Sequence, residues 1–66
     1  MAWTERQKQM RRLEAIHANL DNDLVYLKEF SDLYGQDHPN LAEFAEAIAR
    51  VLILAQEHTI ALREAI

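Results

Sequence analysis

Two histidines are the residues in this sequence with the most distinctive chemistry. A chain folded into a hairpin about positions 37–38 brings His17 and His58 to one level. Imidazoles bind zinc and iron, and they change charge near neutral pH. The pair therefore predicts a metal site, a pH-sensitive layer or a polar layer between helices. We favour the polar layer, with hydrogen bonds to Thr59 or to backbone carbonyls fixing the register.

The carboxylates near His17 do not complete a metal-binding motif. Glu14 and His17 have the Glu-x-x-His spacing of di-iron bundles, but the motif occurs once and those bundles need two copies. Asp21-Asn22-Asp23 looks like the start of a calcium loop, yet the downstream glycine and the closing glutamate are missing. We expect no metal ion and no other cofactor.

Nucleophilic catalysis has almost no support in this composition. Ser31 is the only serine, cysteine is absent, and one glycine cannot form a glycine-rich phosphate loop. We expect that the protein is not an enzyme.

A short basic segment near the start of the chain offers contacts to phosphate. It contains Arg6, Lys8, Arg11 and Arg12. Trp3 could stack on a base beside it, which would suit a nucleic-acid-binding regulator. The other interpretation is a solvated helix face whose charges meet Glu57 and Glu64. Because the chain has a net charge of −4 and a pI near 5.2, nucleic acid is the alternative and not the first choice.

Negative charge gathers in the middle of the sequence. The acidic residues there are Asp21, Asp23, Glu29, Asp32, Asp37, Glu43 and Glu46. Residues 1–18 have a net charge of +2 and residues 19–46 of −6, so a folded hairpin has one acidic end. The cluster could hold a metal or imitate a nucleic-acid backbone, but a soluble acidic surface is the simpler interpretation.

Helices must position these residues, since the chain has one glycine and one proline. We predict a first helix over about 5–34, with Thr4 and Gln7 forming a capping box at its start. Its heptad seam consists of Trp3, Met10, Leu13, His17, Leu20, Leu24, Leu27 and Tyr34, with Arg6 and Ser31 as further polar positions. Residues 19–23 offer a break, but the heptad passes through without a phase change, so we prefer one continuous helix.

A turn over residues 35–40 should separate the two helices. Gly35 is expected to be left-handed, and Pro39 cannot continue the first helix. Asn40 and Glu43 fit an N-cap and its capping box, so the second helix should run over about 41–65. The hairpin then pairs residues whose numbers sum to about 75. The expected pairs are Tyr34 with Leu41, Leu27 with Ile48, Leu24 with Val51, Leu20 with Ala55, and Leu13 with Leu62.

The second helix is apolar nearly all round, which one antiparallel neighbour cannot cover. Sixty-six residues are also near the lower limit for independent folding, and no disulfide can help. We therefore predict a single all-α domain, a two-helix hairpin paired into a homodimeric four-helix bundle, with a tetramer as the alternative. The expected oligomer interface is Phe44, Ile48, Val51, Leu52, Ile53 and Leu54.

Apolar residues on the first helix suggest a second contact surface. Tyr26, Phe30 and Leu33, rimmed by Glu29 and Asp32, are expected to bind a larger protein. The predicted function is a non-enzymatic interaction module of the inhibitor, adaptor or chaperone type. No apolar run approaches the ~20 residues of a membrane span, and a signal-peptide core is missing, so we expect a cytoplasmic protein without a membrane partner.

Overall fold

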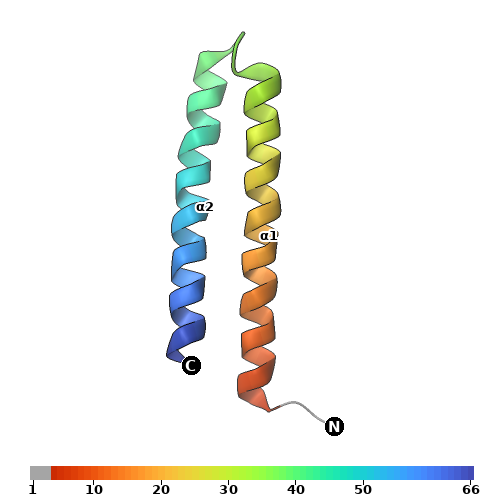
Figure 1. The fold of residues 1–66 in the computed structure, drawn as a ribbon. Helices are drawn as coiled ribbons and strands as arrows, with labels where there is room; N and C mark the ends of the chain where they lie inside the picture. Colours follow the sequence, from red (N-terminus) through yellow and green to blue (C-terminus); the bar gives the residue numbers. More distant parts are fainter. Residues whose placement is uncertain (1–3) are drawn as a thin grey trace.

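The computed structural model describes residues 4–66 and shows two antiparallel helices joined by a short turn (Figure 1). Helix α1 spans Glu5–Tyr34 and helix α2 spans Pro39–Ala65. No strand occurs in the described residues. The prediction of an all-helical hairpin is confirmed. Trp3, expected at the start of the heptad seam, lies outside the described residues.

The start of α1 is fixed by the predicted capping box. Gln7 N donates to Thr4 Oγ1 at 3.2 Å, and Thr4 N donates to Gln7 Oε1 at 3.0 Å. Each bond satisfies a backbone N–H that the first helical turn leaves without a partner. From this cap α1 continues without interruption through residues 19–23. The preference for one continuous helix is therefore confirmed.

The turn corrects the expectation for Gly35. Its φ of −65° and ψ of −29° are right-handed, and its N–H donates to the Ser31 carbonyl at 2.8 Å, continuing the helical pattern. The glycine is needed for space instead. A Cβ at this position would lie 2.5 Å from Ser31 O and 3.1 Å from Ala42 Cβ. Close approach of the Ser31 carbonyl, with Ala42 of the second helix next, and not a left-handed backbone, explains the residue.

The start of α2 also differs from the sequence prediction. The helix begins at Pro39, with His38 as an N-cap whose side chain makes no capping hydrogen bond. Proline suits this first helical position because its backbone has no N–H to satisfy. The His38 carbonyl instead accepts a hydrogen bond from Leu41 N at 3.0 Å. The predicted capping box of Asn40 and Glu43 is therefore wrong.

The heptad seam of α1 packs against α2 along most of its length. Its half-buried members are Met10, Leu13, His17, Leu20, Leu24, Leu27 and Ser31. Arg6 and Tyr34, at the two ends of the predicted seam, are exposed. The seam prediction is thus confirmed between residues 10 and 31.

Helix α2 turns a different face to α1 than the sequence suggested. Its less exposed residues form a stripe, called here the inner stripe: Leu41, Ala42, Ala45, Ala49, Leu52, Ala55, Gln56 and Thr59. Ala45, with 4% of its surface exposed, is the only buried residue among residues 4–66. The expected seam residues Ile48, Val51 and Leu62 are 50%, 65% and 54% exposed. The prediction of which side of α2 contacts α1 is therefore wrong.

The hairpin alone encloses no core of large side chains. No large side chain in the described residues is fully buried, and the Cα radius of gyration is 15.7 Å. A compact chain of this length has a radius of gyration of about 11 Å. The molecule is long and thin, with Cα extents of 54 × 21 × 9 Å. Many large apolar side chains consequently stay exposed on the outside of the hairpin.

Candidate interaction surfaces

One broad face carries a shallow groove between the helices near the turn. It has a volume of about 280 Å³ and is lined by Leu27, Phe30, Leu41, Phe44, Ala45 and Ile48. We call it the apolar groove, because none of its lining side chains is charged or polar. The Phe30 and Tyr34 rings lie beside each other on α1, with centroids 5.0 Å apart and planes tilted by 46°. Both helices therefore contribute aromatic surface to this end of the hairpin.

The predicted oligomer residues lie on the outside of α2, with one exception. Phe44, Ile48, Val51, Ile53 and Leu54 are exposed, whereas Leu52 is half-buried within the inner stripe. Helical spacing places Phe44, Ile48 and Val51 on one side of α2 and Ile53 on the other side. The six residues therefore do not form one surface. Phe44 and Ile48 belong to the apolar groove.

The predicted partner-binding residues are also exposed and also divide. Phe30 lines the apolar groove, with 39% of its surface exposed. Tyr26 and Leu33 lie farther round α1, and Leu33 is 74% exposed. The carboxylates of Glu29 and Asp32 are exposed as well. The structure thus joins Phe30 to the groove residues of α2 and leaves Tyr26 and Leu33 on the outer side of α1.

The opposite broad face is polar where the helices meet. A hollow of about 420 Å³ there is lined by Leu13, Glu14, His17, Ala18, Asp21, Thr59, Ile60 and Arg63. An ion pair of 2.9 Å joins Arg63 Nη2 of α2 to Glu14 Oε1 of α1. Farther along, Gln56 Nε2 donates to Asp21 Oδ1 at 2.6 Å. Polar bonds between the helices on this face contrast with the uncharged groove on the other.

The two histidines do not meet, which corrects the expectation of a shared layer. His17 is half-buried, and its Nδ1 lies 3.7 Å from Asp21 Oδ2 on the same helix. His58 is exposed, and the hollow beside His17 is lined by Thr59 and not by His58. The Thr59 hydroxyl donates to the Ala55 carbonyl at 2.7 Å. Within the part of the chain that the structure describes, no three His, Cys, Asp or Glu side chains are grouped to hold a metal ion.

The basic segment lies on the exposed surface near the open end of the hairpin. Its members Arg6, Lys8, Arg11 and Arg12 are all exposed. Arg6 Nε donates to the Ile66 carbonyl at 2.7 Å, which ties this segment to the end of α2. We expected Glu57 and Glu64 to meet these charges, but the ion pair between the helices joins Glu14 and Arg63.

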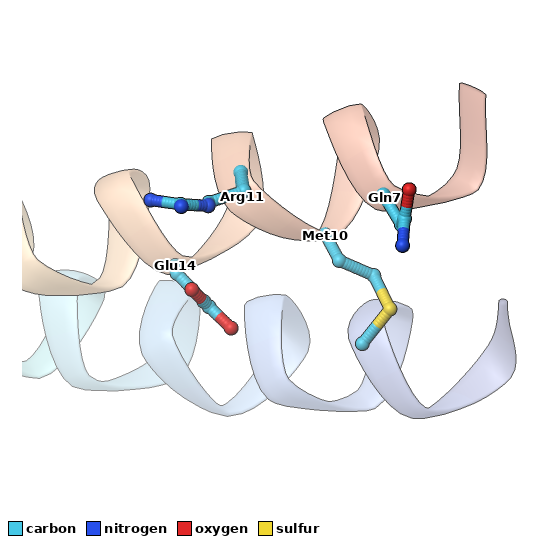
Figure 2. Close-up of a pocket in the computed structure, with 4 residues that line it drawn as sticks. All are labelled: Gln7, Met10, Arg11 and Glu14. Atoms are coloured by element: carbon cyan, nitrogen blue, oxygen red, sulfur yellow. The ribbon is translucent and has the colours of Figure 1, made fainter. Parts of the chain in front are cut away.

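Figure 2 shows a shallow pocket on α1 in this same region, lined by Gln7, Met10, Arg11 and Glu14. The Met10 and Glu14 side chains extend toward α2, whereas the Arg11 side chain runs along α1. The pocket thus has an apolar floor of methionine with a cation and an anion beside it. Glu14 already forms an ion pair with Arg63 of α2, so its side chain in this pocket contributes to the contact between the helices.

The residues that the sequence reasoning missed are the small ones of the inner stripe. Ala42, Ala45 and Ala49 recur at intervals of three and four residues, which is a helical period. That period was available in the sequence, but bulkier apolar residues follow the same period on the adjacent face. Gln56 was missed because a polar residue between Ala55 and Glu57 gave no signal of a contact between helices.

Compared with known proteins, the chain matches no family model, no curated protein and no solved structure. The function must therefore be argued from the surfaces themselves. Over the described residues, neither α1 nor α2 combines the length and the apolar character that crossing a bilayer requires.

Proposed function

We propose that this chain is a non-enzymatic interaction module, a self-associating helical hairpin that binds and modulates a larger protein partner. In this proposal two hairpins pair into a homodimeric four-helix bundle. The supporting observation is that Ala45 alone is buried among residues 4–66, while fourteen large apolar side chains are exposed. Among them Phe30, Phe44 and Ile48 lie together at the apolar groove, and exposed apolar patches of this kind commonly mark interaction sites.

The surface area supports the same proposal quantitatively. The hairpin exposes 5410 Å². A compact monomer of 7.7 kDa exposes about 4,300 Å². The excess of about 1,100 Å² exceeds the roughly 800 Å² that each partner buries in a standard protein–protein interface. One interface of standard size would cover most of this surplus, and the larger interface of an obligate dimer would cover all of it.

Sedimentation equilibrium at micromolar concentration tests self-association. We expect a mass of two chains for the natural sequence and one chain for Val51→Glu, because Val51 is 65% exposed and should become buried in the dimer. Lys28→Glu, a charge change elsewhere on the surface, is the control and should remain dimeric. A natural sequence that sediments as a monomer would contradict the proposal.

The partner-binding part of the proposal rests on Tyr26 and Leu33. Neither lines the apolar groove, and Leu33, on the outer side of α1 and 74% exposed, stays accessible when that groove is covered. The acidic residues Glu29 and Asp32 would favour a partner with a basic face, mainly by steering its approach. In affinity capture from the native host, Leu33→Ala should lose the captured protein while sedimenting as the natural sequence does. Val25→Ala, an exposed apolar residue on another side of α1, should retain it.

Nucleic-acid binding is the second candidate, and the exposure of Arg6, Lys8, Arg11 and Arg12 favours it. It predicts salt-dependent binding to mixed oligonucleotides, with Arg12→Ala weakening the affinity and flattening its salt dependence. We also propose that the protein works in the cytoplasm, since a cysteine-free chain needs no oxidising compartment. Cell fractionation with an antibody to the chain tests the location.

A further inference from the structure

We propose that the apolar groove is covered by a second copy of this chain in antiparallel orientation, with Ala55 at the twofold axis. This inference rests on the self-association proposed above and specifies its geometry. In such a dimer the two turns lie at opposite ends, α1 packs on α1 of the second copy, and α2 packs on α2 of the second copy.

The first argument is the symmetry of the exposed apolar residues on α2. We call Phe44, Ile48, Val51, Leu62 and Ile66 the outer stripe, all of them exposed and on one side of the helix. When a second α2 lies antiparallel to the first with the two Ala55 residues opposite each other, facing residues have numbers that sum to 110. This brings Ile48 level with Leu62 of the second copy, and Phe44 level with Ile66. Apolar side chains therefore meet in both halves of the contact.

Ala55 suits the position on the axis. It lies where the outer stripe meets the inner stripe, at intervals of seven residues from Ile48 and Leu62. At a twofold axis a residue meets its own copy, and a small side chain there lets two helices approach closely. The Arg6 bond to the Ile66 carbonyl holds the end of the outer stripe in place for the contact.

The second argument is that the parallel dimer gives the outer stripe a poorer partner. In that arrangement α2 packs on α1 of the second copy, with both turns at one end. Asp23 and Arg12 lie seven and eighteen residues before Phe30, on the same side of α1. In the parallel dimer residues level with each other have numbers that sum to about 75–77, so Asp23 and Arg12 would come within about one turn of Val51 and Leu62 of the second copy. The outer stripe would then lie partly against charged side chains, which is unfavourable. In the antiparallel dimer Asp23 and Arg12 instead face α1 of the second copy, and the outer stripe meets its own apolar residues.

The third argument is charge complementarity. The turn half of the hairpin, residues 20–55, has seven carboxylates and two cations, a net charge of −5. The open half, residues 4–19 and 56–66, has five cations and four carboxylates, a net charge of +1. A parallel dimer places two acidic halves together, whereas the antiparallel dimer places each acidic half on a weakly basic one. Screening over about 8 Å in physiological salt limits this effect to charges near the contact, where it selects the orientation.

A charge exchange between Ile48 and Leu62 tests the proposed pairing. Ile48→Glu and Leu62→Lys should each weaken dimerisation by about tenfold or more, because each buries an unpaired charge. The double variant should dimerise more strongly than either single variant, since the carboxylate introduced on one copy would face the ammonium group introduced on the other. Ile48→Glu combined with Val25→Lys is the matched control and should show no recovery. Simple addition of the two single losses in the double variant would overturn the pairing.

Distances between spin labels test the orientation directly. The chain has no cysteine, so Gln36→Cys labels the turn alone. On the isolated dimer, the antiparallel arrangement gives a label separation of about 55 Å, from a rise of 1.5 Å per residue on each side of Ala55. A separation below about 25 Å would mean adjacent turns, overturning the orientation while self-association stands. If no dimer can be isolated by sedimentation, self-association itself fails and the orientation proposal with it.

Discussion

Gln56 on α2 donates a 2.6 Å hydrogen bond to the Asp21 carboxylate on α1, and its amide also lies 3.4 Å from the His17 carbonyl. Gln56 thereby contacts two residues one turn apart on the facing helix. A slip of α2 by one turn would break both bonds. This amide and the Glu14–Arg63 ion pair, and not the histidine pair suggested by the sequence, are polar contacts that fix the register of the two helices.

Removing either partner of this bond should therefore cost stability. We expect Gln56→Ala and Asp21→Ala to show a coupling of about 0.5–1 kcal/mol in the free energy of unfolding, the size of a partly exposed charge-assisted hydrogen bond. Urea denaturation of the two single variants and the double variant measures it, at one protomer concentration because self-association affects stability. The control is the same cycle with Asp23→Ala in place of Asp21→Ala, and its coupling should be near zero. Equal couplings for both aspartates would contradict the assignment.

The Thr4 cap gives a second prediction. Thr4→Ala removes the acceptor for Gln7 N and should lower the free energy of unfolding by about 1 kcal/mol. Thr4→Ser keeps a hydroxyl and should recover most of the loss. Circular dichroism during thermal unfolding measures both variants. The same loss in Thr4→Ser and Thr4→Ala would show that the hydroxyl bond is not the cause.

The sequence predicted α1 well, because its apolar residues form a single heptad seam and its cap has a specific pattern. It also predicted which residues of the two helices lie side by side along the hairpin, since Glu14 pairs with Arg63 and Gly35 approaches Ala42. Both pairs have residue numbers that sum to 77, close to the expected 75. Length, capping and turn chemistry are local properties, and local properties can be read from a sequence.

The face of α2 could not be read in the same way. This helix has two adjacent apolar stripes, and the pattern of apolar residues does not say which one faces α1. The bulky outer stripe with Ile48 and Val51 looked like the better core. Small residues such as Ala45 and Ala49 let the helix axes approach, however, and packing in the hairpin uses that stripe. Choosing between stripes requires the shapes of both helices together.

Gly35 leads to a third prediction, which tests whether glycine is required by lack of space for a side chain or by its backbone conformation. Replacing a glycine in a right-handed conformation by alanine normally stabilises a protein, because alanine gives the unfolded chain less conformational freedom to lose on folding. Here the new Cβ would meet the Ser31 carbonyl at 2.5 Å, so we expect Gly35→Ala to destabilise the hairpin by about 1–3 kcal/mol. Gln36→Ala in the same turn should change stability by less than about 0.5 kcal/mol. Urea midpoints compare the two; a stabilised Gly35→Ala would contradict the close approach.

Ala45 provides the most direct test of how closely the helices approach each other. It is 4% exposed where α2 faces α1, so a larger side chain there would push the two helices apart or turn into the apolar groove. We expect Ala45→Leu to lower the free energy of unfolding by about 1–3 kcal/mol, although leucine is more apolar than alanine. Ala47→Leu makes the same chemical change two residues away on an exposed position, and it should stay within about 0.5 kcal/mol of the natural sequence. Urea denaturation at one protomer concentration compares the two variants. Ala45→Leu that is as stable as Ala47→Leu would mean that the bulky stripe, and not the alanine stripe, faces α1 in solution. The apolar groove would then be filled from within the hairpin, and the surface proposed for the second copy would no longer exist.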